Sequence, residues 1–397
     1  MALSAVAMFL LSACTGGASA GGGSGSGGTG GAAATTTTAA VSIDISPAAD
    51  ASVSPTTPIV VTASHGTLRS VAVTNAATKV AVTGDLSADK TKWTSNEPLG
   101  YGASYQVVAD GASPTGVASQ RTSTIKTLSP RLTTYASLLP PPNVTDVGVG
   151  QPIVVLFDQS VAKANEADVE RSLQVTSNPV QPGSWYWVTS KEAHYRPKDY
   201  WQPGTTINVN LNIYGVNFGN GVYGRTDRSE TLHVHDSWIA KADGSTDKMQ
   251  IFHNGQLVNT MPISLGSPGH PSHTGVHVIS DKQPSVVMDS CTYGVCKGQP
   301  GYYSETVYLD ERISDDGEFV HSAPWSVGQQ GSTNVSHGCV NLSPANAQWF
   351  YDHFGLGDVV DISNSGGKQL PLWDIYGDWE LSWQQWQSGS ALPAQNN

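Results

Sequence analysis

The most constraining feature of this sequence is a series of short β-branched segments separated by clusters of turn-forming residues. From Val41 onward the segments cover residues 41–45, 58–61, 71–73, 79–82 and 105–108. Short strands at this spacing are typical of β-sandwiches. With 42 glycines, 23 prolines and 13% charged residues, the composition also favours strands and turns over a helical bundle. We therefore expect a mainly β fold.

The strand pattern contains an internal repeat. The tetrad Pro-Ile-Val-Val occupies residues 58–61 and recurs at residues 152–155. This repeat predicts two immunoglobulin-like modules, residues 41–127 and 128–236, each near the roughly 100 residues of such a sandwich. Neither module contains a cysteine or a catalytic constellation, so a spacer or binding role is expected for both.

The first residues predict a membrane anchor. The largely apolar run from Ala2 to Ala13 has 12 residues, whereas a spanning helix needs about 20, so residues 1–13 are interpreted as a signal peptide. Its end, Leu-Ser-Ala-Cys14, resembles a bacterial lipobox, and Cys14 would then carry lipid. No Lys or Arg precedes Cys14, so a degraded signal with a chance cysteine stays open as the alternative.

Residues 14–40 predict a solvated tether behind that cysteine, because they are Gly, Ser, Ala and Thr with nothing to bury. The expected location is the cell envelope, on the outer face of the cytoplasmic membrane. The chain has 20 Lys and Arg against 32 Asp and Glu and no basic cluster, so a nucleic-acid partner is not expected.

The candidate chemistry lies past Asp236. The segment 321–343, HSAPWSVGQQGSTNVSHGCVNLS, places Cys339 18 residues after His321 and two residues after His337. A thiolate is the reactive form of cysteine, and a neighbouring imidazole can lower the pKa of the thiol. His321, delivered from a separate strand end, is the better candidate for the base. A structural cysteine beside surface histidines is the alternative for a lone Cys–His pair.

Gly338 stands directly before this cysteine, where it would let a substrate approach the backbone closely. The N–H groups of Gly338 and Cys339 are therefore predicted to bind a developing oxyanion.

The whole segment resembles the signature of the L,D-transpeptidase family: an upstream His, then Ser-His-Gly-Cys, a hydrophobic residue and Asn. The resemblance implies a catalytic domain over residues 237–370. It also implies that Cys339 is the acylated nucleophile and His321 the general base, with the backbone carbonyl of Ser322 orienting the imidazole.

The same resemblance implies the residues that shape the substrate pocket. The strand motif GSPGHPSHTGVHVI at 266–279 is similar to a family strand motif, with His277 in place of the usual aromatic residue. The implied pocket residues are Met288, Tyr303, Trp325, Ser336, His337 and Asn341.

By this resemblance the protein cross-links peptidoglycan. Cys339 would attack the third residue of a tetrapeptide stem, release the terminal D-alanine and pass the acyl group to the diamino acid of a second stem. Carbapenems would acylate the same cysteine. Alternatives are an L,D-carboxypeptidase that ends with water, an enzyme that attaches proteins to peptidoglycan, and a non-catalytic wall-binding lipoprotein.

No cofactor or metal is predicted. Cys291 and Cys296 lack a second cysteine pair for zinc, and a small disulfide loop and two free thiols both remain open. The spacing of His270, His273 and His277 fits neither a helical pair nor a zinc finger. We assign His273 and His277 to the wall of the substrate groove.

The C-terminal part predicts a helix and then a tryptophan-rich extension, residues 371–397. Ser343 and Pro344 are typical of an N-cap and a first helical residue. The four tryptophans of the extension are expected to pack between the catalytic domain and the second module; they are Trp373, Trp379, Trp383 and Trp386.

Overall fold

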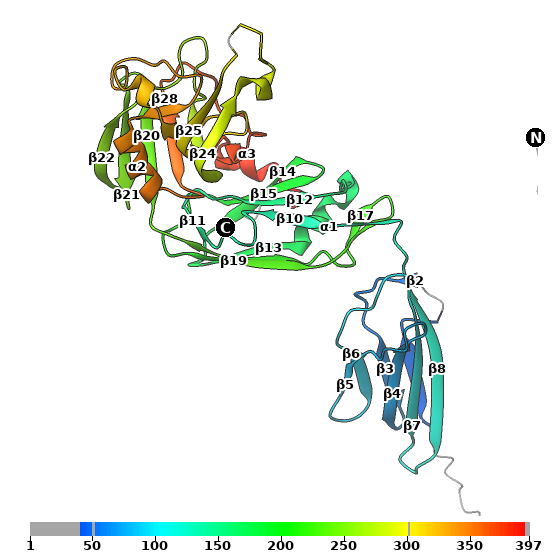
Figure 1. Cartoon of the computed structure of the whole chain (residues 1–397). Helices are drawn as coiled ribbons and strands as arrows, with labels where there is room; N and C mark the ends of the chain where they lie inside the picture. Colours follow the sequence, from blue (N-terminus) through cyan, green and yellow to red (C-terminus); the bar gives the residue numbers. More distant parts are fainter. Residues whose placement is uncertain (1–39, 50–51, 301, 394–397) are drawn as a thin grey trace, which may run out of the picture.

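The computed structural model of the protein describes residues 40–49, 52–300 and 302–393. The predicted signal peptide, Cys14 and almost all of the predicted tether lie outside the described residues. Figure 1 shows three β-rich units that follow one another along the chain, with the first set apart at one end. The fold is therefore mainly β, as the sequence predicted. In the described part of the chain, no helix combines the length and apolar character needed to cross a bilayer.

The first unit is a sandwich of two four-stranded sheets. One sheet has the order β1 (Ser42–Ser46), β3 (Val60–Ser64), β6 (Lys92–Ser95) and β5 (Gly84–Leu86). The other has the order β2 (Ser52–Val53), β8 (Ala118–Thr127), β7 (Ser104–Ala112) and β4 (Thr67–Asn75). Their inner faces bury the β-branched residues on which the prediction rested, such as Val61, Val107 and Ile125.

One predicted strand of this unit is wrong. Residues 79–82 form only an isolated bridge, between Thr74 and Ala81. The Asn75 side chain accepts hydrogen bonds from the N–H groups of Ala77 and Thr78, both at 3.0 Å, and Lys79 has a φ of 63°. This Asx-type turn bends the backbone out of the extended form, so local turn chemistry overrides the β-branched pattern.

The second unit is also a sandwich. One sheet has the order β10 (Ala136–Leu139), β12 (Ile153–Phe157), β15 (Glu192–Pro197) and β14 (Gly183–Thr189). The other has the order β11 (Asp146–Val147), β19 (Arg228–Val234), β16 (Thr206–Leu211) and β13 (Leu173–Asn178). A small sheet of β17 (Asn217–Gly219), β18 (Val222–Gly224) and β9 (Leu132–Thr134) lies beside them, with η1 (Lys163–Asn165) and α1 (Glu166–Ser172).

The two sandwiches share one topology. The two copies of Pro-Ile-Val-Val lead into β3 and β12, and each of these strands is second in its sheet. In the opposite sheets, β2 pairs with β8 and β11 with β19, in both cases parallel, while all other pairings in the four sheets are antiparallel. The sequence repeat is thus matched strand for strand by the fold.

The third unit contains two further sheets. The five-stranded sheet has the order β22 (Gln256–Pro262), β21 (Lys248–His253), β20 (Trp238–Asp243), β28 (Val359–Ser363) and β23 (Gly275–Val278). The four-stranded sheet has the order β24 (Asp281–Asp289), β25 (Ser304–Arg312), β26 (Phe319–Ser322) and β27 (Val340–Leu342). Short 3₁₀ segments η2 (Ser290–Tyr293) and η3 (Pro324–Ser326) interrupt the connections.

Helix α2 (Pro344–His353) follows the last strand of the four-stranded sheet directly. The Ser343 hydroxyl accepts a hydrogen bond from the Asn346 N–H, which makes Ser343 the predicted N-cap. Ala347, Phe350 and Phe354 turn inward and join the core of this unit. The helix therefore packs against β27, the strand that begins directly after Cys339.

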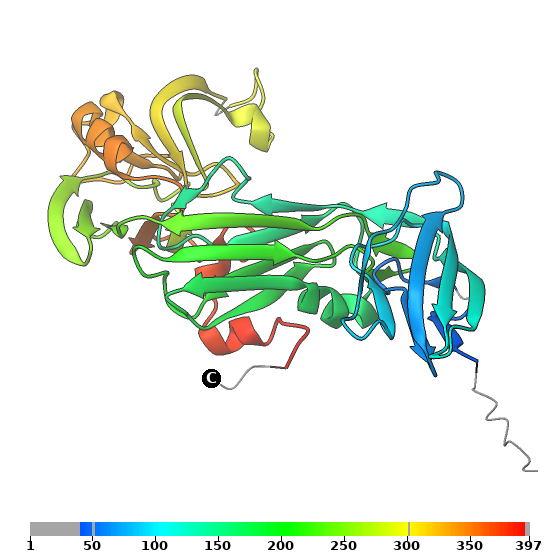
Figure 2. The same cartoon turned by 90° about the horizontal axis from the view of Figure 1, so that it is seen from below.

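The C-terminal segment runs back along the second sandwich through η4 (Gly377–Glu380) and α3 (Trp383–Gln387), as Figure 2 shows. Trp379 donates to the carbonyl of Gly150, and the fully buried Trp386 donates to that of Ser184. Trp373 is 66% exposed, so the expectation that all four tryptophans pack here is wrong for this one. Trp373 precedes η4 and α3, the two elements that pack against the second sandwich.

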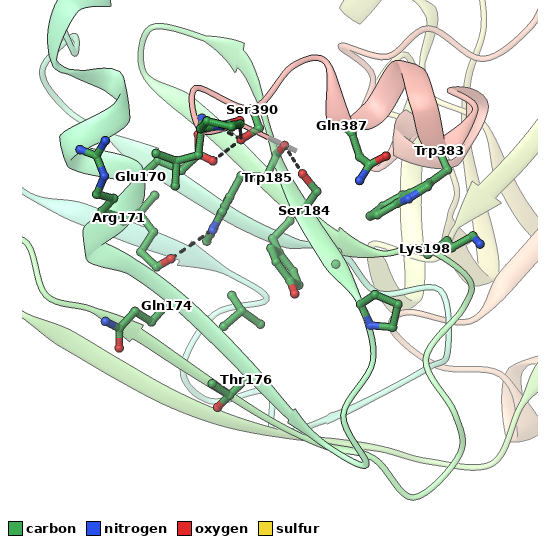
Figure 3. Close-up of a pocket in the computed structure, with 17 residues that line it drawn as sticks. Glu170, Arg171, Gln174, Thr176, Ser184, Trp185, Lys198, Trp383, Gln387 and Ser390 are labelled. Atoms are coloured by element: carbon green, nitrogen blue, oxygen red, sulfur yellow. Dashed lines mark hydrogen bonds between the residues drawn. The ribbon is translucent and has the colours of Figure 1, made fainter. Parts of the chain in front are cut away.

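A groove of about 560 Å³ is lined by residues of α3 and the chain after it and by residues of β13 and β14. Figure 3 shows Trp383 and Gln387 on one wall and Gln174 and Thr176 on the other. The tail closes one end of the groove, where the hydroxyl of Ser390 donates to the carboxylate of Glu170.

Two residues of β15 hold this C-terminal segment by charge. The Arg196 guanidinium lies 4.6 Å from the Trp379 ring and 4.7 Å from the Trp386 ring, and it donates to the Asp378 and Leu381 carbonyls. His194 Nδ1 is 2.7 Å from the Asp378 carboxylate. Burial opposes protonation of His194, but Asp378 and Glu192 outweigh it and raise its pKa to about 9.

Replacement of Asp378 by Asn should loosen this segment, because breaking one partner of a buried ion pair costs about 3–5 kcal/mol. The raised pKa of His194 means that its contribution to stability is complete below about pH 6.5 and is lost as the pH rises through about 9. Hydrogen exchange of residues 377–387 at pH 6.5 and 9.5 measures both effects. The Asn variant should show a weaker pH dependence, since Glu192 still contacts His194; equal dependence in the two proteins would refute the clamp.

Candidate active site

The candidate site is built on the parallel pairing of β26 and β27. The register pairs Val320 with Val340 and His321 with Asn341. Cys339 directly precedes β27, so it lies two positions before the residue opposite His321. Side chains two positions apart share one face of a sheet, and His321 and Cys339 accordingly line the same pocket.

This pocket has a volume of about 280 Å³ and collects the predicted substrate-binding residues. All six line it together with Cys339 and His321; they are Met288, Tyr303, Trp325, Ser336, His337 and Asn341. Gly338 and Ser322 do not line it but flank the two residues that do. The pocket therefore unites side chains from β24, β25, β26, η3 and β27.

Three further pocket residues were not singled out in the sequence: Glu305, Val307 and Val335. Glu305 and Val307 lie on β25. With Tyr303 they form the alternating series 303, 305 and 307, which puts one face of a strand toward the cavity. This alternation is the sequence signal from which Glu305 and Val307 could have been predicted.

His321 is held in one orientation. Its Nδ1 lies 3.0 Å from the carbonyl oxygen of Ser322, as the resemblance implied for that carbonyl. A carbonyl can only accept, so Nδ1 carries the hydrogen and the lone pair of the neutral ring lies on Nε2. The Trp325 ring lies 5.9 Å from the imidazole ring. The base thus has its tautomer set by the backbone.

Both reactive groups are buried, and burial keeps both uncharged. It raises the pKa of the Cys339 thiol to about 12 and lowers the pKa of the His321 imidazole to about 4. The thiol points to the carbonyl oxygen of Gly317, 3.8 Å from the sulfur. This direction is opposite to the lowering of the thiol pKa by an imidazole that the sequence predicted, and burial is its largest cause.

The loop before the nucleophile is fixed by Ser336. Its hydroxyl accepts from the N–H of Gly338 at 3.1 Å and donates to the carbonyl of Cys339 at 2.6 Å. Gly338 has a φ of 124°, a conformation that only glycine adopts readily. The Gly338 N–H is thus engaged within the loop, and its oxyanion role stays a prediction.

Asn341 and His337 hold opposite parts of the pocket. The Asn341 side chain, buried, donates to the hydroxyl of Ser326 at 3.1 Å. The His337 ring lies 5.2 Å from the Tyr303 ring and 4.9 Å from the His270 ring. The Asn341 side chain is therefore held in place inside the pocket. The His337 ring instead contacts Tyr303, at the end of the connection between β24 and β25.

The connection between β24 and β25 contains a disulfide between Cys291 and Cys296, one of the two states left open by the sequence. Beside it, the hydroxyl of Ser290 donates to the carbonyl of Val295 and accepts from the N–H of Tyr303. The covalent bridge and these hydrogen bonds tie the tip of the hairpin to the pocket residue at its base.

His273 and His277 do not line the pocket, so their assignment to its wall is wrong. Both lie behind the nucleophile loop, where they contact the buried carboxylate of Glu318. Among the described residues, no set of three or more His, Cys, Asp or Glu side chains is arranged to hold a metal ion.

Comparisons with known proteins agree with this architecture. A family model described as a bacterial Ig domain matches residues 50–217, and the L,D-transpeptidase catalytic domain matches residues 237–362. The chain is 40% identical to L,D-transpeptidase 2 of Mycobacterium tuberculosis, covering 84% of this chain and 81% of that protein. It is 34% identical to L,D-transpeptidase 5 of the same species, over 86% of this chain and 75% of the relative.

Among solved structures, an L,D-transpeptidase in complex with imipenem is 34% identical and superimposes with a TM-score of 0.51, covering 59% of this chain and 100% of that one. The identity and coverage of these relatives, together with a pocket lined by His321, Ser336, His337, Cys339 and Asn341 of the motif, place the chain in the L,D-transpeptidase family.

Proposed function

We propose that this protein cross-links peptidoglycan stems through a thioester on Cys339. The sulfur attacks the carbonyl carbon of the third residue of a tetrapeptide stem, the C–S bond forms, and the amide bond to the terminal D-alanine breaks. The side-chain amine of the diamino acid in a second stem then attacks the thioester, forms the new amide and restores the thiol. The observation that carries this proposal is the shared pocket of Cys339 and His321.

The neutral state of the two groups defines the proton path. Nε2 of His321, which carries the lone pair, accepts the thiol proton as the C–S bond forms and returns it to the departing amine. In the second half-reaction the same nitrogen takes a proton from the attacking amine. A general base that is already neutral at pH 7 needs no prior deprotonation, which suits the lowered pKa of His321.

We assign the oxyanion to the backbone N–H of Cys339, since the Gly338 N–H is engaged by Ser336. A backbone donor held by a hydrogen-bonded loop needs no rearrangement as charge develops on the carbonyl oxygen. The Ser336 hydroxyl then acts by fixing the loop, through its bonds to both sides of the nucleophile.

Water or a protein lysine as acceptor would give a carboxypeptidase or an attachment enzyme. The wall-binding alternative needs no thiol at all. We favour transpeptidation because the relatives that cover most of this chain are themselves L,D-transpeptidases.

Replacement of Cys339 by Ala should abolish product formation from a disaccharide-tetrapeptide. Mass spectrometry of the products separates the hypotheses, since a cross-linked dimer, a trimmed monomer and a protein adduct differ in mass. The wild-type protein should form the dimer through a covalent species equal to the protein plus the donor minus D-alanine. An active Ala variant with an unchanged thermal unfolding midpoint would contradict the thioester mechanism.

We propose that carbapenems acylate Cys339, on the basis of the related structure in complex with imipenem. Because the pKa of His321 is lowered to about 4, the acylation rate should rise from about pH 4 and stay level through pH 6–8. Intact-protein mass after timed incubation with imipenem gives this rate. A half-maximal rate near pH 6.5 would show that the base has an ordinary pKa, and an unchanged mass in all samples would remove the assignment.

We also propose that lipid on Cys14 anchors the protein at the outer face of the cytoplasmic membrane, with residues 15–40 as the tether. At about 5–6 Å × √n, this tether reaches roughly 30 Å on average. Replacement of Cys14 by Ala in the full chain should move the protein from the membrane fraction to the soluble or secreted fraction. Equal membrane retention of both forms would refute the anchor.

A further inference from the structure

A buried carboxylate lies beneath the nucleophile loop, outside the substrate pocket. Glu318 is 6% exposed. Its Oε1 is 3.2 Å from Nδ1 of His273 and accepts the backbone N–H of the same residue at 2.9 Å. Its Oε2 is 3.5 Å from Nε2 of His277, which is fully buried. One carboxylate thus bridges two histidines that belong to the strand motif at 266–279.

This carboxylate lies against the residue before the nucleophile. A Cβ placed on Gly338 would be 3.2 Å from Oε1 of Glu318. The neighbours of Glu318 in the chain contact the sulfur itself: Gly317 accepts from the thiol, and the backbone of Phe319 hydrogen-bonds Cys339. Glu318 is therefore close to Cys339 in two ways: its carboxylate lies against Gly338, and its neighbours in the sequence contact Cys339.

The imidazole of His273 contacts the Glu318 carboxylate and can act as its counter-ion. Burial would raise the pKa of Glu318, but hydrogen bonds from His273 and His277 lower it below its ordinary value. The hydrogen bond to Glu318 in turn raises the pKa of His273, against its partial burial. Glu318 is ionised, and it adds to the rise in the pKa of the Cys339 thiol.

Other charged groups surround the cluster. Asp316 Oδ2 is 3.7 Å from Nδ1 of His273, and Asp374 and Asp316 both favour the charged ring. Near His277, burial raises the pKa of Asp361 and the His277 imidazole partly offsets this rise. Asp315 and Arg312 interact with each other on the approach to Glu318. Of the two histidines that contact Glu318, His273 is partly exposed and can exchange its proton with solvent, whereas His277 is fully buried.

We propose that Glu318 is a positioning residue that keeps the Cys339 thiol protonated, and that His273 is the counter-ion whose protonation relieves this effect. The inference rests on the proposed role of Cys339 as nucleophile. With His273 protonated, the pair is neutral and thiolate formation beside it is less opposed. With His273 neutral, the carboxylate is uncompensated and the sulfur holds its proton more tightly.

The experiment measures the ionisation of the thiol without any cell-wall substrate. Iodoacetamide alkylates the thiolate, so the alkylation rate of Cys339 at fixed pH, followed by intact mass, reports the pKa of the thiol. The full chain is compared with Glu318→Gln, His273→Gln and the double variant, at pH 6.5 and at pH 9.5.

The two single variants should change the rate in opposite directions at pH 6.5. Glu318→Gln should raise it at both pH values, and more at pH 9.5, where less of the carboxylate's charge is compensated; the upper limit is about tenfold, the one-unit shift expected when a nearby like charge is removed. His273→Gln should lower it several-fold at pH 6.5 and less at pH 9.5, because the wild-type ring loses its proton as the pH rises. In the Glu318→Gln background, His273→Gln should have no effect at either pH.

Glu380→Gln is the matched control. The Glu380 carboxylate accepts from the Val276 N–H of β23, the strand that carries His277, but lies on another side of it. If loosening of β23 were the cause, this control would change the rate as Glu318→Gln does. That result, or rates that fall in both single variants, would overturn the proposal.

The two hypotheses fail separately. An unchanged alkylation rate in Glu318→Gln, in a protein that still forms a covalent species with donor stem, removes the role of Glu318 and leaves the proposed function intact. If Glu318→Gln does not fold, His273→Gln alone decides the matter through its pH-dependent rate.

Discussion

The parallel hydrogen-bonded pairing of β26 with β27 is the constraint on which the site depends. It brings together two segments that are 18 residues apart, those of His321 and Cys339. Val320 and Val340 on these strands are fully buried in the core that Phe350 of α2 completes. The reacting groups therefore stand on rigid, buried strands, where geometry is more precise than on loops.

Burial has two effects on the chemistry. It withdraws the nucleophile from water, and it holds Cys339 as a thiol and His321 as a neutral imidazole. The resting site thus avoids two buried charges, whose desolvation would have to be recovered by their attraction. In the mechanism that we propose, charge separates only at the moment of attack, when a substrate carbonyl receives the electrons and a backbone N–H stabilises the oxygen.

Much of the fold could be predicted from local patterns. Alternation of β-branched residues marked the strands, and the repeated tetrad marked the two sandwiches with one topology. The failures have local or long-range causes. The turn at Asn75 overrides the strand propensity of residues 79–82, while Trp373 stays exposed because docking begins after it, at the partners of Arg196.

The sequence predicted which residues form the site better than it predicted the protonation states of Cys339 and His321. The resemblance gave most of the residues that line the pocket, because short motifs fix residue types and spacing, but not Glu305, Val307 and Val335. The state of Cys339 depends on desolvation and on Glu318, which reaches it through tertiary packing. The engagement of the Gly338 N–H by Ser336 is likewise a matter of loop conformation that spacing does not specify.

The catalytic unit and the sandwiches are linked by the C-terminal segment, which contacts both. Trp379 donates to Gly150 of the second sandwich, while Glu380 accepts from Val276 in the catalytic unit. Tyr101 of the first sandwich hydrogen-bonds Gly215 and Gly224 of the second. These contacts join the three units in a row, with the second sandwich between the first sandwich and the catalytic unit (Figure 1).

Before substrate binds, burial keeps both the Cys339 thiol and the His321 imidazole neutral. Nitrogen-15 NMR of the His321 ring at pH 6, assigned by comparison with His321→Gln, measures the state of the imidazole. The ring should be the neutral tautomer, with a protonated Nδ1 and an unprotonated Nε2. Two protonated ring nitrogens at that pH would show an imidazolium beside a thiolate and would contradict it.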